Sequence, residues 1–250
     1  MANPVLSNRV FDKATTSYGQ ATMTIKGTVI KSLILTFMVL LGASYTWREF
    51  YMSFDPSVVR PWMIGGALGG FVSAIIISFN PKLAQYLAPV YAVLQGLFLG
   101  AISAFFNEAF SHTAPDLVIN AVLLTIVTTL VMLTIYRSNL IKVNSQFRKI
   151  LTIAISSIVF YYLISIILSF FGVNLTMLHN SSPLSIGISL VIVGVAAFSL
   201  LMDFDFIEKA SYSGAPKYME WYGAFALMVT IIWLYLEILK LLAKFAGRRD

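Results

Sequence analysis

The stretch Leu184-Ser-Ile-Gly-Ile-Ser-Leu-Val-Ile-Val-Gly-Val-Ala-Ala-Phe-Ser-Leu-Leu-Met202 contains no charged residue, and it decides the class of fold. An apolar run of about 20 residues is long enough for one α-helix to cross the hydrocarbon core of a bilayer. Lipid offers no hydrogen-bond partners, so a crossing backbone must pair internally, either as a helix or as a closed barrel. Barrel strands alternate over ~10 residues, which this continuous run does not. The stretch therefore predicts a transmembrane helix.

Six more apolar runs lie before and after this stretch, separated by short polar loops. They span Val29–Trp47, Trp62–Phe79, Leu83–Phe106, Leu117–Tyr136, Ile150–Phe171 and Trp221–Leu239. Of the 250 residues, 58% are hydrophobic and only 11% are charged, whereas about a quarter of a soluble domain is charged. We therefore predict an all-α polytopic membrane bundle with about seven transmembrane helices. Its expected parts are a cytoplasmic N-terminal segment (1–27), a single transmembrane domain (28–246) and a C-terminal tail (247–250).

Lysine and arginine gather in the loops and tails, and their distribution predicts the orientation of the bundle. If the N-terminus is cytoplasmic, the following basic residues fall inside: Arg9, Lys13, Lys26, Lys31, Lys82, Arg137, Lys142, Arg148, Lys149, Lys209 and Lys217. The outer loops then hold only Arg48 and Arg60. A full seventh crossing leaves the basic tail outside, whereas a re-entrant last segment returns it inside, and we favour the full crossing. The net charge of +6 fits topology and lipid headgroups better than nucleic acid.

Glycines are concentrated in the second and third spans at the spacing of helix contacts. They are Gly65, Gly66, Gly69 and Gly70 in the second span, and Gly96 and Gly100 in the third. Small residues four positions apart let helix backbones approach closely in lipid. We expect these glycines to pack helices within the bundle, and a homodimer face is the alternative.

Carboxylates in or beside the apolar runs are the sharpest functional clue, because a charge at the bilayer centre costs ~2.5–3.5 kcal/mol. Asp203 and Asp205 follow the sixth span, and Glu237 lies within the seventh. A structural reading makes the aspartates helix-end charges and pairs Glu237 with Lys240, three residues on. The functional reading is a facing carboxylate pair, in which repulsion raises one pKa and the oxygens suit Ca²⁺. Such a pair could couple proton binding to cation passage.

Other chemistries find little support in the sequence. The chain has no cysteine, which leaves no disulfide or thiol chemistry. It also lacks a Gly-x-Ser-x-Gly nucleophile elbow and a phosphate-binding loop. We therefore expect no enzyme activity and no cofactor.

The last third of the chain resembles the Bax inhibitor-1 family of small multi-span membrane proteins. The resemblance rests on Asp203-Phe204-Asp205-Phe206-Ile207-Glu208-Lys209 and Trp233-Leu234-Tyr235-Leu236-Glu237-Ile238-Leu239. The family typically ends its sixth helix with an Asp followed four residues later by Ile. Its last helix carries a Leu-Tyr-Leu-Asp-like stretch, in which Glu237 stands here for the usual Asp. Residues 3–6 and 220–223 look like a bacterial branch of the family.

The resemblance implies a bundle with the last helix central, in a bacterial cytoplasmic membrane. It implies a pH-sensitive Ca²⁺ leak or exchange path, gated by Asp203 and Glu237 as the carboxylate pair, with Asp205 as accessory or alternative. It also implies roles in stress tolerance. A second hypothesis is a membrane-embedded regulator that transports nothing and binds other membrane proteins. The expected partners are the lipid bilayer, Ca²⁺ and protons.

The depth of Glu237 limits whether the two carboxylates can meet. At about 1.5 Å per residue, Glu237 lies roughly 24 Å along the seventh span from Trp221, whereas Asp203 lies at the near end of the sixth. The two meet only if the seventh helix has a cytosolic extension, if the sixth helix ends deep, or if the last segment is re-entrant. Otherwise Glu220 is the closer neighbour of Asp203 and Asp205.

Overall fold

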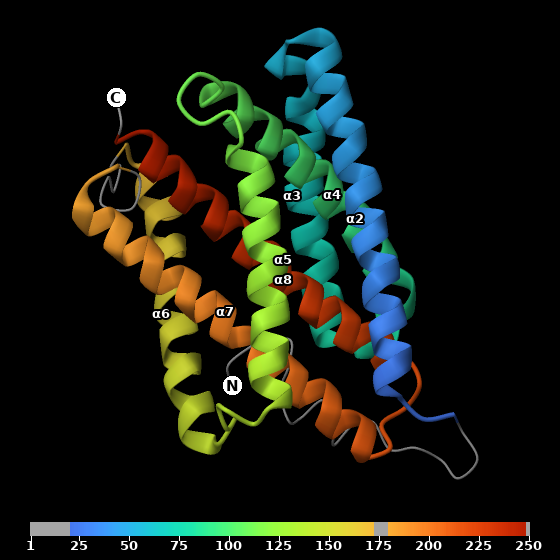
Figure 1. The fold of residues 1–250 in the computed structure, drawn as a ribbon. Helices are drawn as coiled ribbons and strands as arrows, with labels where there is room; N and C mark the ends of the chain where they lie inside the picture. Colours follow the sequence, from blue (N-terminus) through green and yellow to red (C-terminus); the bar gives the residue numbers. More distant parts are fainter. Residues whose placement is uncertain (1–20, 173–179, 249–250) are drawn as a thin grey trace. The chain divides into compact units, whose positions relative to one another are not determined.

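The computed structural model describes residues 21–172 and 180–248, and its regular structure there is helical. The elements are α2 (Ile25–Ser53), α3 (Pro56–Phe79), the 3-10 turn η1 (Pro81–Leu83), α4 (Ala84–Ala109), α5 (Leu117–Arg137), α6 (Ser145–Phe170), α7 (Pro183–Tyr212) and α8 (Met219–Ala246) (Figure 1). Seven helices of the described chain are long and apolar enough to cross a membrane. The predicted all-α polytopic bundle is confirmed.

Side-chain caps set where several of these helices begin. The hydroxyl of Thr24 accepts a hydrogen bond from the backbone N–H of Gly27 at 3.0 Å, at the start of α2. Asp55 caps α3 by accepting from the backbone N–H of Ser57 at 2.8 Å. The hydroxyl of Ser57 also donates to Asp55, and these two bonds lower the pKa of the Asp55 carboxyl. Each cap satisfies an N–H group that has no partner within its helix.

The polar connection that the sequence predicts between the sixth span, ending at Met202, and the seventh, beginning at Trp221, is a charged loop from Asp203 to Glu220, and this prediction is wrong over most of its length. Helix α7 continues past Met202 to Tyr212, and α8 already begins at Met219. Phe206, Ile207 and Ala210 explain the extension, because they recur at helical spacing and are buried. Glu208 and Lys209, which lie between them, occupy the more exposed side of the same helical turn.

The described helices form two compact groups. The first, called the α2–α4 group, runs to Ala109 and also contains Asp205 to Val229, so it includes the end of α7 and the start of α8. The second, called the α5–α6 group, contains Phe110 to Phe204 and the chain from Thr230 onward. The single transmembrane domain over residues 28–246 stays a prediction.

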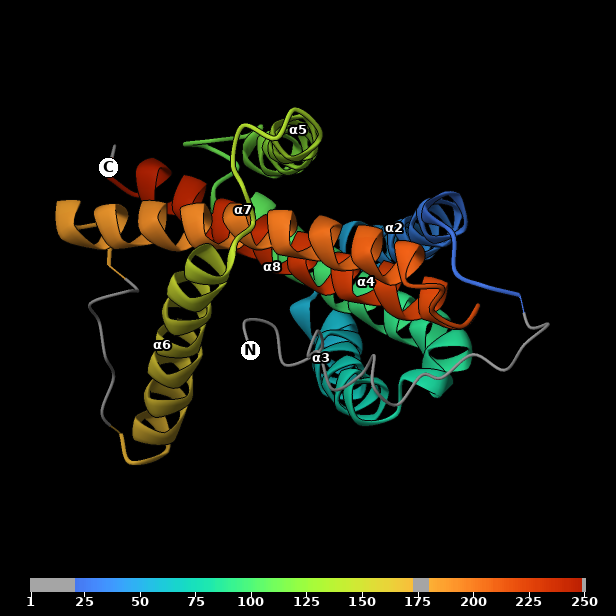
Figure 2. The ribbon, with the colours of Figure 1, turned by 90° about the horizontal axis from the view of Figure 1, so that it is seen from below.

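Glycine brings the helices of the α2–α4 group together. Helix α4 packs against both α2 and α3, which contact each other much less (Figure 2). A Cβ atom on Gly66 would overlap the backbone carbonyl of Leu94, and one on Gly96 would overlap the carbonyl of Val39. Gly69, Gly70 and Gly100 also face a neighbouring helix, whereas Gly65 faces open space. Five of the six glycines singled out in the sequence therefore lie at helix contacts of this chain.

Helix α8 is the most enclosed of the seven spans. Within its apolar window, 61% of the residues are buried, against 11% in α5 and in α6. This burial agrees with the predicted central position of the last helix. The helix runs without interruption for 28 residues, which is about 42 Å and exceeds the ~30 Å hydrocarbon core. An unbroken helix of this length fits a full crossing better than a re-entrant segment.

Candidate functional site

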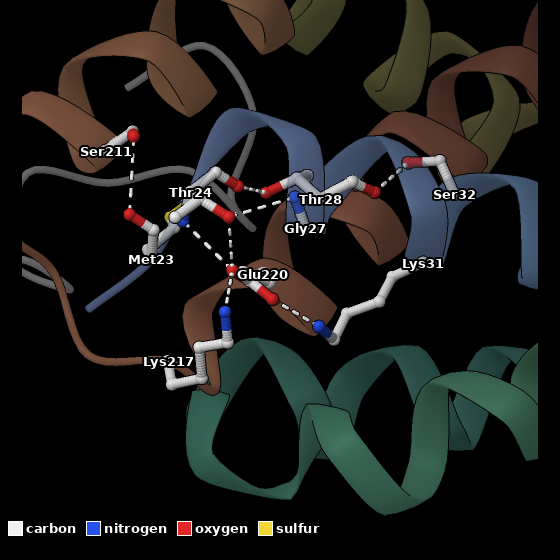
Figure 3. A network of polar contacts seen from close by, with 9 residues as sticks. All are labelled: Met23, Thr24, Gly27, Thr28, Lys31, Ser32, Ser211, Lys217 and Glu220. Carbon is white, nitrogen blue, oxygen red and sulfur yellow. Dashed lines mark hydrogen bonds and ion pairs between the residues drawn. The ribbon is translucent and has the colours of Figure 1, made fainter. Parts of the chain in front are cut away.

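Glu220 carries a fully buried carboxylate in the first turn of α8 (Figure 3). Its Oε1 accepts hydrogen bonds from the backbone N–H of Thr24 at 3.0 Å and from the Thr24 hydroxyl at 2.9 Å. Lys217 Nζ lies 2.7 Å from the same oxygen. Oε2 pairs with Lys31 Nζ. A negative charge in a first turn is also stabilised by the helix dipole.

The sequence of α2 presents the matching face. Thr24, Gly27 and Lys31 follow one another at spacings of three and four, so they lie on one side of the helix start. Gly27 leaves room for the Glu220 carboxylate, which a Cβ atom at this position would overlap. The Lys31 ammonium lies 5.5 Å from the centroid of the Trp221 ring, which adds a cation–π contact. Glu220 therefore fastens the start of α2 to the start of α8.

Backbone hydrogen bonds reinforce this attachment. Met23 N–H donates to the carbonyl of Ala215 at 2.7 Å, and Lys217 N–H donates to that of Ala21 at 3.1 Å. The hydroxyl of Ser211 donates to the Met23 carbonyl at 3.3 Å (Figure 3). The segment before α2 thus pairs with the α7–α8 connection. Glu220 takes its partners from α2 and this connection, where the sequence had suggested it as a neighbour of the two aspartates.

Gly27→Ala is expected to lower the unfolding temperature of the purified protein in detergent. The new methyl group takes the space of the Glu220 carboxylate and forces it away from Lys31, at a cost of about 1–3 kcal/mol, as for other overpacked sites. Gly65→Ala is the matched control, because the space beside Gly65 is open. Equal unfolding temperatures for the two variants would show that the Glu220 contacts tolerate a side chain at position 27.

Glu237 forms a second polar cluster, in the α5–α6 group. Its side chain is only 4% exposed, and Oε1 lies 2.6 Å from Lys240 Nζ. The hydroxyl of Tyr162 donates to Oε1 at 2.9 Å, and the indole N–H of Trp233 donates to it at 3.3 Å. Lys240 Nζ also lies 3.3 Å from the Tyr162 hydroxyl. The ion pair expected from the three-residue spacing of Glu237 and Lys240 is therefore present.

Lys244 lies one turn beyond Lys240 and was not singled out in the sequence. Its ammonium donates to the hydroxyl of Ser185 at 2.9 Å and to that of Ser189 at 2.6 Å. Two serines four residues apart on one span, together with a lysine near the end of the next span, are the sequence pattern that could have indicated this contact. These contacts also fix the register of α7 and α8 within the α5–α6 group.

Asp203 and Asp205 both lie inside α7 and are buried, with 1% and 7% of each residue exposed. Asp205 forms an ion pair with Lys209, 2.9 Å away and one turn later. Counted from the contact of Lys244 with Ser189, Asp203 lies about 21 Å along α7, whereas Glu237 lies about 10 Å along α8. Asp203 and Glu237 therefore occupy different levels, and a direct hydrogen bond between them needs a relative shift of the two helices.

A family model described as Bax inhibitor 1 like matches residues 3–247, nearly the whole chain. The chain belongs to the Bax inhibitor 1-like family. Comparison with curated proteins gave no match, and neither did comparison with solved structures. Family membership and the seven apolar helices together make this an integral membrane protein that resides in a lipid bilayer.

Within residues 21–172 and 180–248 of this Bax inhibitor 1-like protein, no three His, Asp or Glu side chains gather as a metal site would require. Besides Glu220, the described part of this family member has three buried acidic side chains: Asp203 and Asp205 on α7, and Glu237 on the second half of α8.

Proposed function

We propose that this protein is a pH-sensitive cation (Ca²⁺) leak channel or exchanger of the Bax inhibitor-1 type. In this proposal Asp203 and Glu237 are the carboxylates that bind the cation and the proton, and their protonation gates the path. Asp205 is an accessory site, and Lys240 modulates Glu237. The protein resides in a bacterial cytoplasmic membrane with its N-terminus in the cytoplasm.

Burial of the acidic side chains is the observation that carries this proposal. Asp203 is 1% exposed and Glu237 is 3% exposed, although both lie in helices that are otherwise apolar. Keeping a carboxylate at such a position is expensive in lipid, and intramembrane carboxylates commonly mark ion or proton paths. A regulator that only binds other membrane proteins has no need of acidic groups turned away from the lipid and the solvent.

Ca²⁺ flux into proteoliposomes at several pH values tests the proposal. Wild type, Asp203→Asn and Glu237→Gln are compared, with Asp116→Asn as the matched control because Asp116 is exposed. We expect pH-dependent flux in the wild type and in the control. Each of the two buried substitutions is expected to lower flux by about tenfold, equivalent to ~1.4 kcal/mol, and to flatten the pH profile.

Equal and pH-independent flux in all four proteins would sink the carboxylate gate. Flux no greater than that of empty liposomes in all of them would favour the regulator that transports nothing. A loss of Ca²⁺ flux in Asp203→Asn alone would restrict the gate to α7 and leave Glu237 with a structural role.

A further inference from the structure

Lys240 occupies the position that a free cation would take beside Glu237. Its ammonium contacts the carboxylate at 2.6 Å and the Tyr162 hydroxyl at 3.3 Å, and it lies 4.9 Å from the centroid of the Tyr162 ring. A carboxylate oxygen, a phenol oxygen and an aromatic face are three groups that attract cations. The groups that hold the Lys240 ammonium are therefore of the kind that also binds a free cation.

Helix α6 carries two further buried hydroxyls, one of them on Tyr161, whose ring centroid lies 6.2 Å from that of Tyr162. The hydroxyls of Tyr161 and Ser165 are buried and have no hydrogen-bond partner within the described residues. Tyr161 and Ser165 are four positions apart, and Tyr162 and Ser165 are three apart, so these hydroxyls lie on neighbouring parts of one helix face. Buried polar atoms are nearly always paired, by protein or by a bound water or ion. Two hydroxyls without a hydrogen-bond partner thus lie on the helix that supplies Tyr162 to the cluster.

The two partners of the ion pair differ in their access to the surroundings. The Glu237 side chain is 4% exposed, whereas the Lys240 side chain is 41% exposed. The long, flexible lysine chain can therefore swing outward while the carboxylate stays enclosed. Because of this difference in exposure, the lysine is the partner that can leave the contact with less obstruction.

We infer that the Lys240 ammonium is a tethered competitor, which must leave Glu237 before Ca²⁺ binds there and which thereby sets the affinity of the site for cations. This inference rests on the proposed function, because it assumes that Glu237 binds Ca²⁺ during transport. An ammonium and Ca²⁺ cannot share one carboxylate oxygen without strong repulsion. Removing the ammonium lowers the barrier to cation entry without removing any ligand oxygen.

Trp233 provides a binding signal that does not depend on transport. Its indole N–H donates to the same Glu237 oxygen that Lys240 contacts, at 3.3 Å. Replacement of Lys240 by Ca²⁺ at that oxygen changes the charge beside the indole and hence its fluorescence. The other three tryptophans, Trp47, Trp62 and Trp221, are replaced by phenylalanine so that Trp233 alone reports.

The experiment measures Ca²⁺ titrations of Trp233 fluorescence and Ca²⁺ flux for the wild type, Lys240→Met, Lys240→Gln and Lys240→Arg. We expect the Met and Gln variants to reach half-saturation at about tenfold lower Ca²⁺, and the Arg variant to stay within about twofold of the wild type. Lys149→Met is the matched control, because it removes the same charge at an exposed position near the start of α6. Two neutral variants are used so that a folding defect in one does not decide the outcome.

An unchanged half-saturation in both neutral variants, or an equal shift in Lys149→Met, would overturn the role of Lys240. If those titrations stay unchanged while Glu237→Gln still loses flux, the proposed transport stands and only the tethered competitor fails. If Glu237→Gln and Asp203→Asn keep full flux while Lys240→Met shifts the titration, the cation site stands and the carboxylate gate fails. A Ca²⁺ response that persists in Glu237→Gln would place the bound ion elsewhere and also overturn the inference.

Discussion

Glu220→Gln is expected to lower the stability of the protein by about 3 kcal/mol, the low end of the range for breaking a buried ion pair by removing one partner. The amide keeps the size of the side chain but loses the charge that two lysines share. Lys31 is the costly partner, because its side chain is only 17% exposed and keeps its ammonium near apolar groups. Lys217 adds less, since its side chain is 52% exposed and remains hydrated.

Thermal unfolding in detergent, followed by gel filtration of the heated samples, measures this effect. Glu108→Gln is the matched control, because it makes the same substitution at an exposed carboxylate of α4. The double variant Glu220→Gln with Lys31→Met should lose less stability than the two single variants together, because the second change removes the ammonium that the first leaves unpaired.

An unfolding temperature of Glu220→Gln equal to that of Glu108→Gln would contradict the structural role of the buried carboxylate. Additive losses in the double variant would show that Lys31 and Glu220 are not coupled. In either case, the backbone hydrogen bond between Met23 and Ala215 would account for the attachment of α2.

Hydropathy predicted the seven helices because lipid imposes one requirement on every crossing segment, a long apolar run with internal hydrogen bonds. Where a helix ends depends on contacts with other helices, and hydropathy along a single sequence does not show these contacts. The charges of Asp203, Asp205 and Lys209 favour a loop in the sequence, whereas Phe206 and Ile207 are buried against Tyr222 and Gly223 at the start of α8, a contact that only the folded chain shows.

The candidate site likewise contains one contact that could be predicted from the sequence and others that could not. The Glu237–Lys240 pair could be predicted because both residues lie on one helix at a spacing of three. The pairing of Glu220 with Lys31 could not be predicted, because Lys31 lies 189 positions away and every other lysine in the loops is an equal candidate in the sequence. The sequence showed both residues at the ends of apolar runs, but only the packing of α2 beside α8 joins them. The different levels of Asp203 and Glu237 likewise follow from the register of α7 and α8.

Gly66→Ala and Gly96→Ala are expected to destabilise the protein by about 1–3 kcal/mol each, whereas Gly65→Ala has no cost. The three glycines differ in what a new methyl group meets. At Gly66 and Gly96 it would overlap a backbone carbonyl, of Leu94 and of Val39, and a backbone cannot rotate away as a side chain can. At Gly65 nothing lies within 4 Å, and alanine is the better helix former by roughly 1 kcal/mol.

The same detergent unfolding assay ranks the three variants, and crosslinking in membranes distinguishes the alternative that these glycines form a homodimer face. Packing within the chain predicts that Gly66→Ala and Gly96→Ala lose stability at every protein concentration. A dimer face predicts that the loss grows as the protein is diluted and that crosslinked dimers disappear with it. A Gly65→Ala variant that is as unstable as Gly66→Ala would contradict the helix contact assigned to α3 and α4, because only one of these two positions faces α4. Gly66 packs against Leu94 of α4, and Gly96 of α4 packs against Val39 of α2. Because Leu94 and Gly96 are only two residues apart, the losses of the double variant Gly66→Ala with Gly96→Ala should depart from additivity.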